Sequence, residues 1–108
     1  VKDTPDANGS YTVYSESAVS SALAAGKKVI LFFHAPWCPT CKAADANFLK
    51  ETAPVNTIVF KTDYDSNVAL KKKYGVTYQH TFVSLNTDGS LKKKMSGADT
   101  FAELVTLN

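Results

Sequence analysis

The stretch Val29 to Lys42 reads Val-Ile-Leu-Phe-Phe-His-Ala-Pro-Trp-Cys-Pro-Thr-Cys-Lys, and it decides the fold. Its first half lies in a nearly all-apolar run from Lys28 to His34, which is rich in β-branched and aromatic residues. Such a run is typical of a central strand that is covered on both faces. After Pro36 and Trp37, a helical composition runs from Cys38 to about Glu51. We therefore predict a buried strand that leads directly into a helix.

The chain has two cysteines, and both lie at the start of this predicted helix in a Cys-x-x-Cys motif. At Cys38, unpaired backbone N–H groups and the helix dipole favour the thiolate, so we expect a pKa below the free value of about 8.5. Cys41 lies one turn further on the same side and is expected to be more buried, with Cys38 the exposed thiol. Cys38 is thus predicted to attack a disulfide and Cys41 to resolve it. A static disulfide or two inert buried thiols are the alternatives.

Working outward, short β-rich runs alternate with helical stretches. We predict strands over residues 11–14, 28–34, 56–63, 81–85 and 90–95, and helices over residues 15–26, 38–51, 66–74 and 99–107. The turn signal at residues 86–89 makes the last two strands an antiparallel hairpin. The sequence predicts an α/β fold with a central mixed sheet of about five strands and helices on both faces. Residues 1–9 are predicted to be a polar N-terminal arm, and residues 10–108 one domain.

Composition excludes several classes of function. A chain of 108 residues has room for one core, and its longest apolar run, Val29 to Phe33, is too short to span a membrane. The net charge is +2, and all twelve cations are lysines. Without arginine the bidentate contacts that read bases and phosphates are missing, so we expect no nucleic-acid partner. We also expect no membrane contact by this domain.

The segment from Val29 to Lys42, including the Trp before the first Cys, resembles the active-site strand and helix of the thioredoxin family. The resemblance extends over about residues 10–107, through Tyr74-Gly75-Val76 and Asp88-Gly89. It implies a thioredoxin fold and a thiol–disulfide oxidoreductase that exchanges disulfides with protein substrates through its Cys-Pro-Thr-Cys motif. We expect a monomer that needs an unidentified redox partner and no cofactor besides its own redox-active Cys38–Cys41 disulfide.

The resemblance also suggests which residues surround the cysteines. We expect Trp37, Pro39, Thr40, Lys61 and His80 to support the chemistry. An extended substrate peptide is expected to lie on a shallow apolar platform. This platform is made of Pro36, Trp37, Tyr78, Gln79, His80 and Thr81.

The chain departs from the family pattern at several positions. Phe32 stands where the family has a buried Asp that helps to deprotonate the resolving Cys, so Lys61 is expected to lack its partner carboxylate. Ala46 replaces a proline that kinks the active-site helix. His80 replaces the loop proline that faces the disulfide. We expect a trans Gln79–His80 bond and an imidazole that faces the sulfurs.

A metal-binding module is the rival hypothesis. Cys38, Cys41, His34 and His80 form a Cys₂His₂ set suited to zinc, and His80 with both thiolates could also complete an iron–sulfur site. For localisation, the Ser-, Thr-, Tyr- and Asn-rich chain and its polar arm lead us to expect an extracytoplasmic protein, periplasmic or membrane-tethered. A cytoplasmic location is the alternative.

Overall fold

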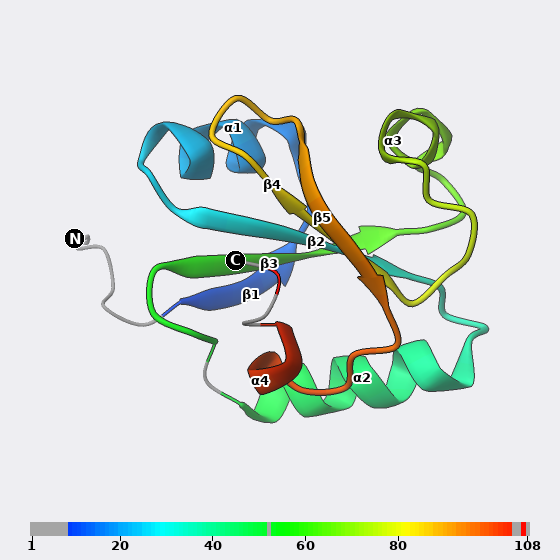
Figure 1. Ribbon diagram of the computed structural model, residues 1–108. Coiled ribbons are helices and arrows are strands. Elements are labelled where there is room, and N and C mark those ends of the chain that lie inside the picture. The colour runs from blue at the N-terminus through cyan, green and yellow to red at the C-terminus, as the bar shows by residue number, and fades with distance from the viewer. Residues whose placement is uncertain (1–8, 52, 105–106, 108) are drawn as a thin grey trace.

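A five-stranded sheet forms the centre of the computed structural model, which describes residues 9–51, 53–104 and 107 (Figure 1). The strands are β1 (Ser10–Val13), β2 (Lys28–His34), β3 (Thr57–Asp63), β4 (Thr81–Leu85) and β5 (Leu91–Ser96). The helices are α1 (Glu16–Ala24), α2 (Pro39–Lys50), α3 (Val68–Tyr74) and α4 (Phe101–Leu104). The strand order is β1-β3-β2-β4-β5, in which β3 pairs in parallel with β1 and β2, and β4 pairs antiparallel with β2 and β5. The prediction of a mixed α/β sheet is confirmed.

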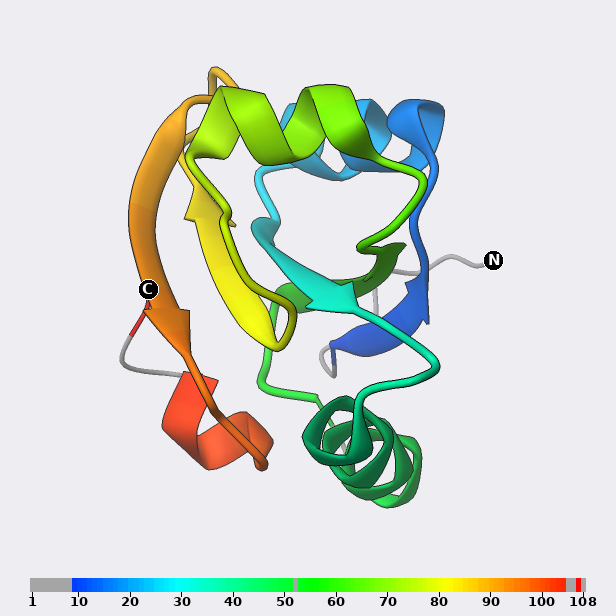
Figure 2. The same cartoon turned by 90° about the vertical axis from the view of Figure 1, so that its right-hand side faces the viewer.

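Helices cover both faces of the sheet, α1 and α3 on one side and α2 and α4 on the other (Figures 1 and 2). The central strand β2 supplies both cores, because successive side chains of a strand point to opposite faces. Ile30 and Phe32 pack beneath α2 and α4, whereas Leu31 and Phe33 pack beneath α1 and α3. All four are at most 1% exposed, which explains the unbroken apolar run.

The helix ends follow their local sequence. The Ser15 hydroxyl accepts the Ala18 N–H at 3.1 Å and caps α1, and Gly75 ends α3 with a left-handed φ of 67°. Thr100 and Glu103 exchange backbone and side-chain hydrogen bonds at the start of α4, as a capping box requires.

Two helices are shorter than predicted. Helix α3 begins two residues late because the Asp63 carboxylate accepts both the backbone N–H and the hydroxyl of Ser66, which holds that segment in a turn. Helix α4 covers only Phe101–Leu104, and positions 105 and 106 of the predicted helix lie outside the described residues.

The N-terminal arm lies outside the described residues except for Gly9, which docks onto the domain. Its N–H donates to the Ala53 carbonyl at 3.4 Å. A Cβ at this position would meet the Thr57 carbonyl oxygen at 2.0 Å, so only glycine fits beside the start of β1. Among the described helices, none is long and apolar enough to cross a membrane.

Candidate active site

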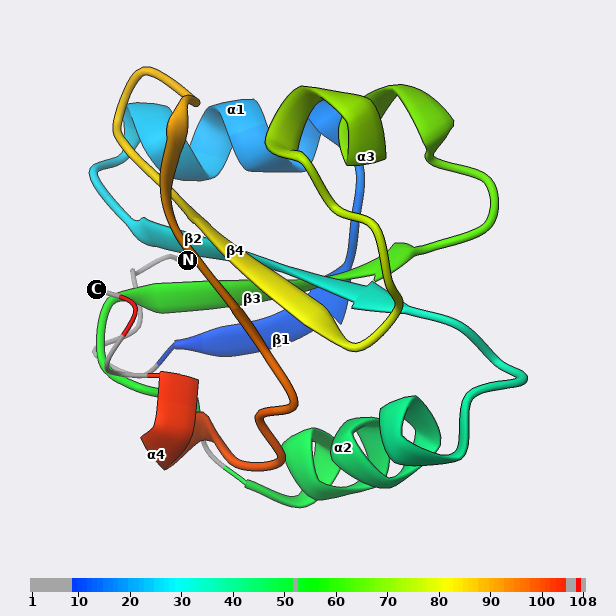
Figure 3. The same ribbon diagram turned by 45° about the vertical axis from the view of Figure 1, so that its right-hand side comes forward.

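The cysteine pair lies at the start of α2, with Cys38 as its N-cap. Figure 3 shows the loop that joins β2 to this helix. The chain leaves β2 at His34 and passes through the exposed Pro36 and Trp37. Cys38 is the N-cap of α2, with extended backbone angles, and its Sγ accepts the Cys41 N–H at 3.3 Å. Pro39 occupies the first turn, where a missing N–H costs nothing. The predicted placement of the motif at a helix N-terminus is correct.

Both thiols are free, and both are buried. Cys41 is 0% exposed, as expected, but Cys38 is only 2% exposed, so the prediction of an exposed attacking thiol is wrong. The reason is local: the Cys38 side chain folds back into the first turn of α2, with its Sγ also 3.3 Å from the Thr40 hydroxyl.

Hydrogen bonding separates the acidities of the two thiols. Burial raises the pKa of Cys38, but hydrogen bonds from the Cys41 thiol, the Thr40 hydroxyl and the Gln79 side chain outweigh it, so the pKa lies below its ordinary value. Burial raises the pKa of Cys41 to about 12, and the hydrogen bond and charge of Cys38 add to this effect. Cys38 therefore ionises first, which is what an attacking thiol requires.

An exposed aromatic surface flanks the buried pair. Trp37 is 55% exposed and Tyr78 is 63% exposed, as a peptide platform requires. The Trp37 indole N–H donates to the Asp65 carboxylate at 2.8 Å, which fixes the ring. Sequence reasoning did not assign Asp65 to the site.

The other half of the predicted platform differs. His80 and Thr81 are buried and present little side-chain surface to a substrate. The Thr81 hydroxyl donates to the Tyr78 carbonyl at 2.8 Å. Gln79 is half-buried, and its side chain contributes to the lowered pKa of Cys38.

His80 is held in the loop by its backbone and by its ring. Its φ is 61°, and its N–H donates to the Phe33 carbonyl at 2.8 Å. The ring Nε2 lies 2.8 Å from the Ala98 carbonyl oxygen and 3.6 Å from the Asp99 carboxylate. The ring Nε2 is thus engaged with the segment before α4, and that the imidazole faces the sulfurs stays a prediction. No peptide bond among the described residues is cis, so the expected trans Gln79–His80 bond holds.

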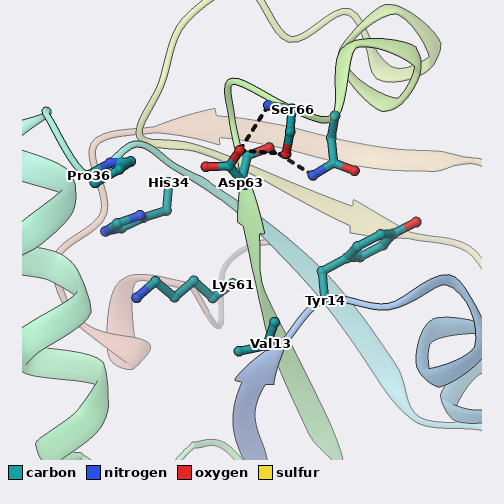
Figure 4. Close-up of a pocket in the computed structure, with 8 residues that line it drawn as sticks. Val13, Tyr14, His34, Pro36, Lys61, Asp63 and Ser66 are labelled. Carbon is teal, nitrogen blue, oxygen red and sulfur yellow. Dashed lines mark hydrogen bonds between the residues drawn. The ribbon is translucent and has the colours of Figure 1, made fainter.

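The metal-site hypothesis finds no support in the part of the chain that the structure describes. There, no three His, Cys, Asp or Glu side chains are grouped so that they could hold an ion. His34 is buried, and its Nε2 has no hydrogen-bond partner among the described residues. It lines a cleft, and the His34 ring extends toward α2 (Figure 4). The two imidazoles and the two thiols therefore do not form one donor set.

Lys61 has a partner that the sequence did not reveal. Its Nζ lies 3.2 Å from the Asp45 carboxylate on α2, so the expectation of an unpaired lysine is wrong. The same carboxylate accepts the Tyr11 hydroxyl at 2.6 Å. The available signal was spacing, since Asp45 lies four residues after Cys41 and therefore on the same face of the helix.

Comparisons with known proteins agree with this geometry. The thioredoxin family model matches residues 10–107. Thioredoxin H4 of Arabidopsis thaliana is 32% identical over 94 residues, covering 85% of this chain and 75% of its own. Protein disulfide-isomerase 1 of Dictyostelium discoideum is 34% identical over 93% of this chain, which spans 29% of that protein.

Solved structures share the fold. Trxlp from Edwardsiella tarda superposes with a TM-score of 0.72 at 25% identity, covering 89% of this chain and 95% of its own. Thioredoxin f from spinach chloroplast superposes with a TM-score of 0.70 at 24% identity, covering 96% of this chain and 93% of its own. The chain belongs to the thioredoxin family, and it is a thiol–disulfide oxidoreductase of that family.

Proposed function

We propose that this protein exchanges disulfides with protein clients through Cys38 and Cys41. The observation that carries the proposal is the position of Cys38 at the N-cap of α2, where its sulfur accepts the Cys41 N–H and lies 3.3 Å from the Thr40 hydroxyl. This geometry agrees with a pKa that is lowered for Cys38 and raised for Cys41. Similarity to a protein disulfide-isomerase supports clients that are themselves proteins.

The exchange has two steps. The Cys38 thiolate attacks one sulfur of a client disulfide, the client S–S bond breaks, and the released client thiolate takes a proton. Cys41 then loses its proton and attacks the Cys38 sulfur, which frees the second client thiol and leaves a Cys38–Cys41 disulfide. Two electrons pass from the protein to the client. The same steps in reverse oxidise a client dithiol, and a separate redox partner restores the starting state.

The exposed aromatic surface suits an extended peptide. Trp37 directly precedes Cys38, and Tyr78 directly precedes Gln79, whose side chain contributes to the lowered pKa of Cys38. Both rings are exposed, and the exposed Pro36 extends the surface beside Trp37. Because Cys38 is 2% exposed, the client must bring its sulfur close to the first turn of α2, where the Cys38 side chain is buried.

Trapping tests the proposal. With Cys41→Ser, the second step is blocked, so client proteins are expected to remain attached to Cys38 as mixed disulfides that dithiothreitol releases. Cys38→Ser removes the attacking thiol and serves as the matched control, with no capture expected and no turnover. If the parent reduces a protein disulfide while Cys41→Ser captures nothing, or if Cys38→Ser retains turnover, the assigned roles are wrong.

We further propose an extracytoplasmic location, as the composition led us to expect. Antibody labelling of fractionated cells that produce the protein from its own gene tests this, and recovery with the cytosolic fraction would contradict it.

A further inference from the structure

Four polar side chains from four elements meet beneath the active-site helix: Tyr11 of β1, His34 of β2, Asp45 of α2 and Lys61 of β3. We call them the polar cluster. Asp45 is its junction, because one carboxylate oxygen accepts the Tyr11 hydroxyl at 2.6 Å and the other lies 3.2 Å from the Lys61 ammonium. The Asp45 side chain is 18% exposed. Figure 4 shows His34 and Lys61 extending from neighbouring strands toward α2.

Cys41 borders this cluster. Cys41 and Asp45 are four residues apart on α2, so their side chains share the face that packs on the sheet. Tyr11 lies within electrostatic range of both, since burial, Asp45 and Cys41 all raise the pKa of its hydroxyl. Cys41 itself is 0% exposed, so its proton cannot pass directly to bulk solvent.

We propose that Asp45 accepts the proton of the Cys41 thiol, through one bridging water, as Cys41 attacks the mixed disulfide. The inference rests on the proposed function above. In this step the Cys41–Cys38 sulfur bond forms, the bond between Cys38 and the client sulfur breaks, and the client thiolate leaves with the electron pair. The thiol proton goes to the Asp45 carboxylate and from there to solvent.

The other titratable groups in and around the polar cluster are poorer acceptors. They are the Tyr11 hydroxyl, the His34 and His80 imidazoles and the Lys61 ammonium. The Tyr11 hydroxyl already donates to Asp45, and a charged lysine has no acceptor site. The His80 Nε2 is engaged with the Ala98 carbonyl. Burial and the Lys61 charge lower the pKa of His34, which makes its ring a weak base. A carboxylate has about four acceptor positions, and Tyr11 and Lys61 use two of those on Asp45.

A route for the proton leads out of the cluster. A cleft of about 530 Å³ opens beside it, lined by His34, Pro36 and Lys61 among others. The Lys61 side chain is 35% exposed and reaches from Asp45 to this cleft. Water in the cleft can therefore exchange protons with the cluster while Cys41 stays covered.

Asp45→Asn tests the inference, because it keeps the shape of the side chain and removes its basicity. The reduced protein is mixed with an aromatic disulfide whose released thiolate is coloured, so that colour appears first when Cys38 attacks and again when Cys41 resolves the adduct. We expect the first phase to be unchanged and the second to slow by at least about tenfold near neutral pH, as for loss of a proton acceptor. The difference should shrink at high pH, where hydroxide removes the proton.

Asp88→Asn is the matched control, since Asp88 lies in the exposed turn before β5 and should leave both phases as in the parent. Equal second phases in Asp45→Asn and Asp88→Asn across the pH range would overturn the inference. Should Asp45→Asn also slow the first phase, Asp45→Glu decides: a restored second phase supports a carboxylate acceptor, and an unrestored one contradicts it. A parent without any second phase would instead refute the proposed function.

Discussion

At the scale of single residues, the two thiols differ because each meets a different set of donors. Cys38 caps the helix, so N–H and hydroxyl groups point at its sulfur, whereas Cys41 sits inside α2 with its sulfur in the core. Helix geometry thus accounts for the order of attack, and exposure does not, because both thiols are buried.

Thr40→Val should slow the reaction of Cys38 with iodoacetamide near neutral pH. The hydroxyl lies 3.3 Å from the Cys38 sulfur and lowers the pKa of that thiol, so its loss raises the pKa and leaves less thiolate. We expect a decrease of up to about tenfold, since one pKa unit is a tenfold change in thiolate population below the pKa. Mass spectrometry of the labelled protein against pH gives the profile. Thr87→Val, in the exposed hairpin turn, is the control, and identical profiles for the two variants would contradict the role of Thr40.

At the scale of elements, the sequence was most informative where structure is local. Three local signals are found as predicted: the apolar run of β2, the cysteine and proline at the start of α2, and the glycine after α3. Each of them depends only on residues that are close in sequence. The pairing of Lys61 with Asp45 joins β3 to α2, and no local pattern reports such a contact.

The loop before β4 shows the same limit. The residue type at position 80 predicted a trans peptide, but not the direction of the ring, because that depends on the Ala98 carbonyl after β5. The His80 side chain ties this loop to the segment before α4.

His80→Pro should destabilise the fold. Proline fixes φ near −65°, whereas His80 has a φ of 61° and donates its N–H to the buried Phe33 carbonyl. Losing that bond and reversing the backbone should cost at least about 2 kcal/mol, or roughly 8–16 °C in the midpoint of thermal unfolding. His80→Asn keeps the N–H and tolerates a positive φ, so it should cost less. Melting curves followed by circular dichroism measure both, and a proline variant as stable as the asparagine variant would show that the loop adopts another conformation.

At the scale of the whole molecule, the two cores differ in polarity. The core between the sheet and the pair α1 and α3 is lined by apolar and aromatic residues, while the one beneath α2 also holds both thiols and borders the polar cluster. Polar groups buried there cost stability unless they are paired, and the His34 Nε2 has no partner within the part of the chain that the structure describes. The side of the sheet that carries the chemistry therefore also holds a buried titratable group that makes stability depend on pH.

His34 should make the protein less stable as the pH falls from about 7.5 to about 5. Burial, followed by the positive charge of Lys61, lowers the pKa of the folded imidazole below its ordinary value of 6.5. Between the His34 pKa of the folded chain and that of the unfolded chain, the unfolded chain binds more protons, so acidification favours unfolding. The stability that the neutral His34 provides is fully present above the unfolded pKa. It is lost as the pH falls through the folded pKa. Asp63 also has a lowered pKa, but its window lies below about pH 4.

Urea unfolding at the two ends of this range measures the effect as a difference in the free energy of unfolding. His34→Phe cannot titrate and fills the same site, so the difference should shrink, and stability should rise at both ends because an unpaired buried nitrogen is removed. His80→Asn is the control and should retain the part of the difference that His34 supplies. If His34→Phe loses as much stability on acidification as the parent does, the dependence comes from other groups, and the unpaired imidazole beneath α2 is not the pH-sensitive point of the fold.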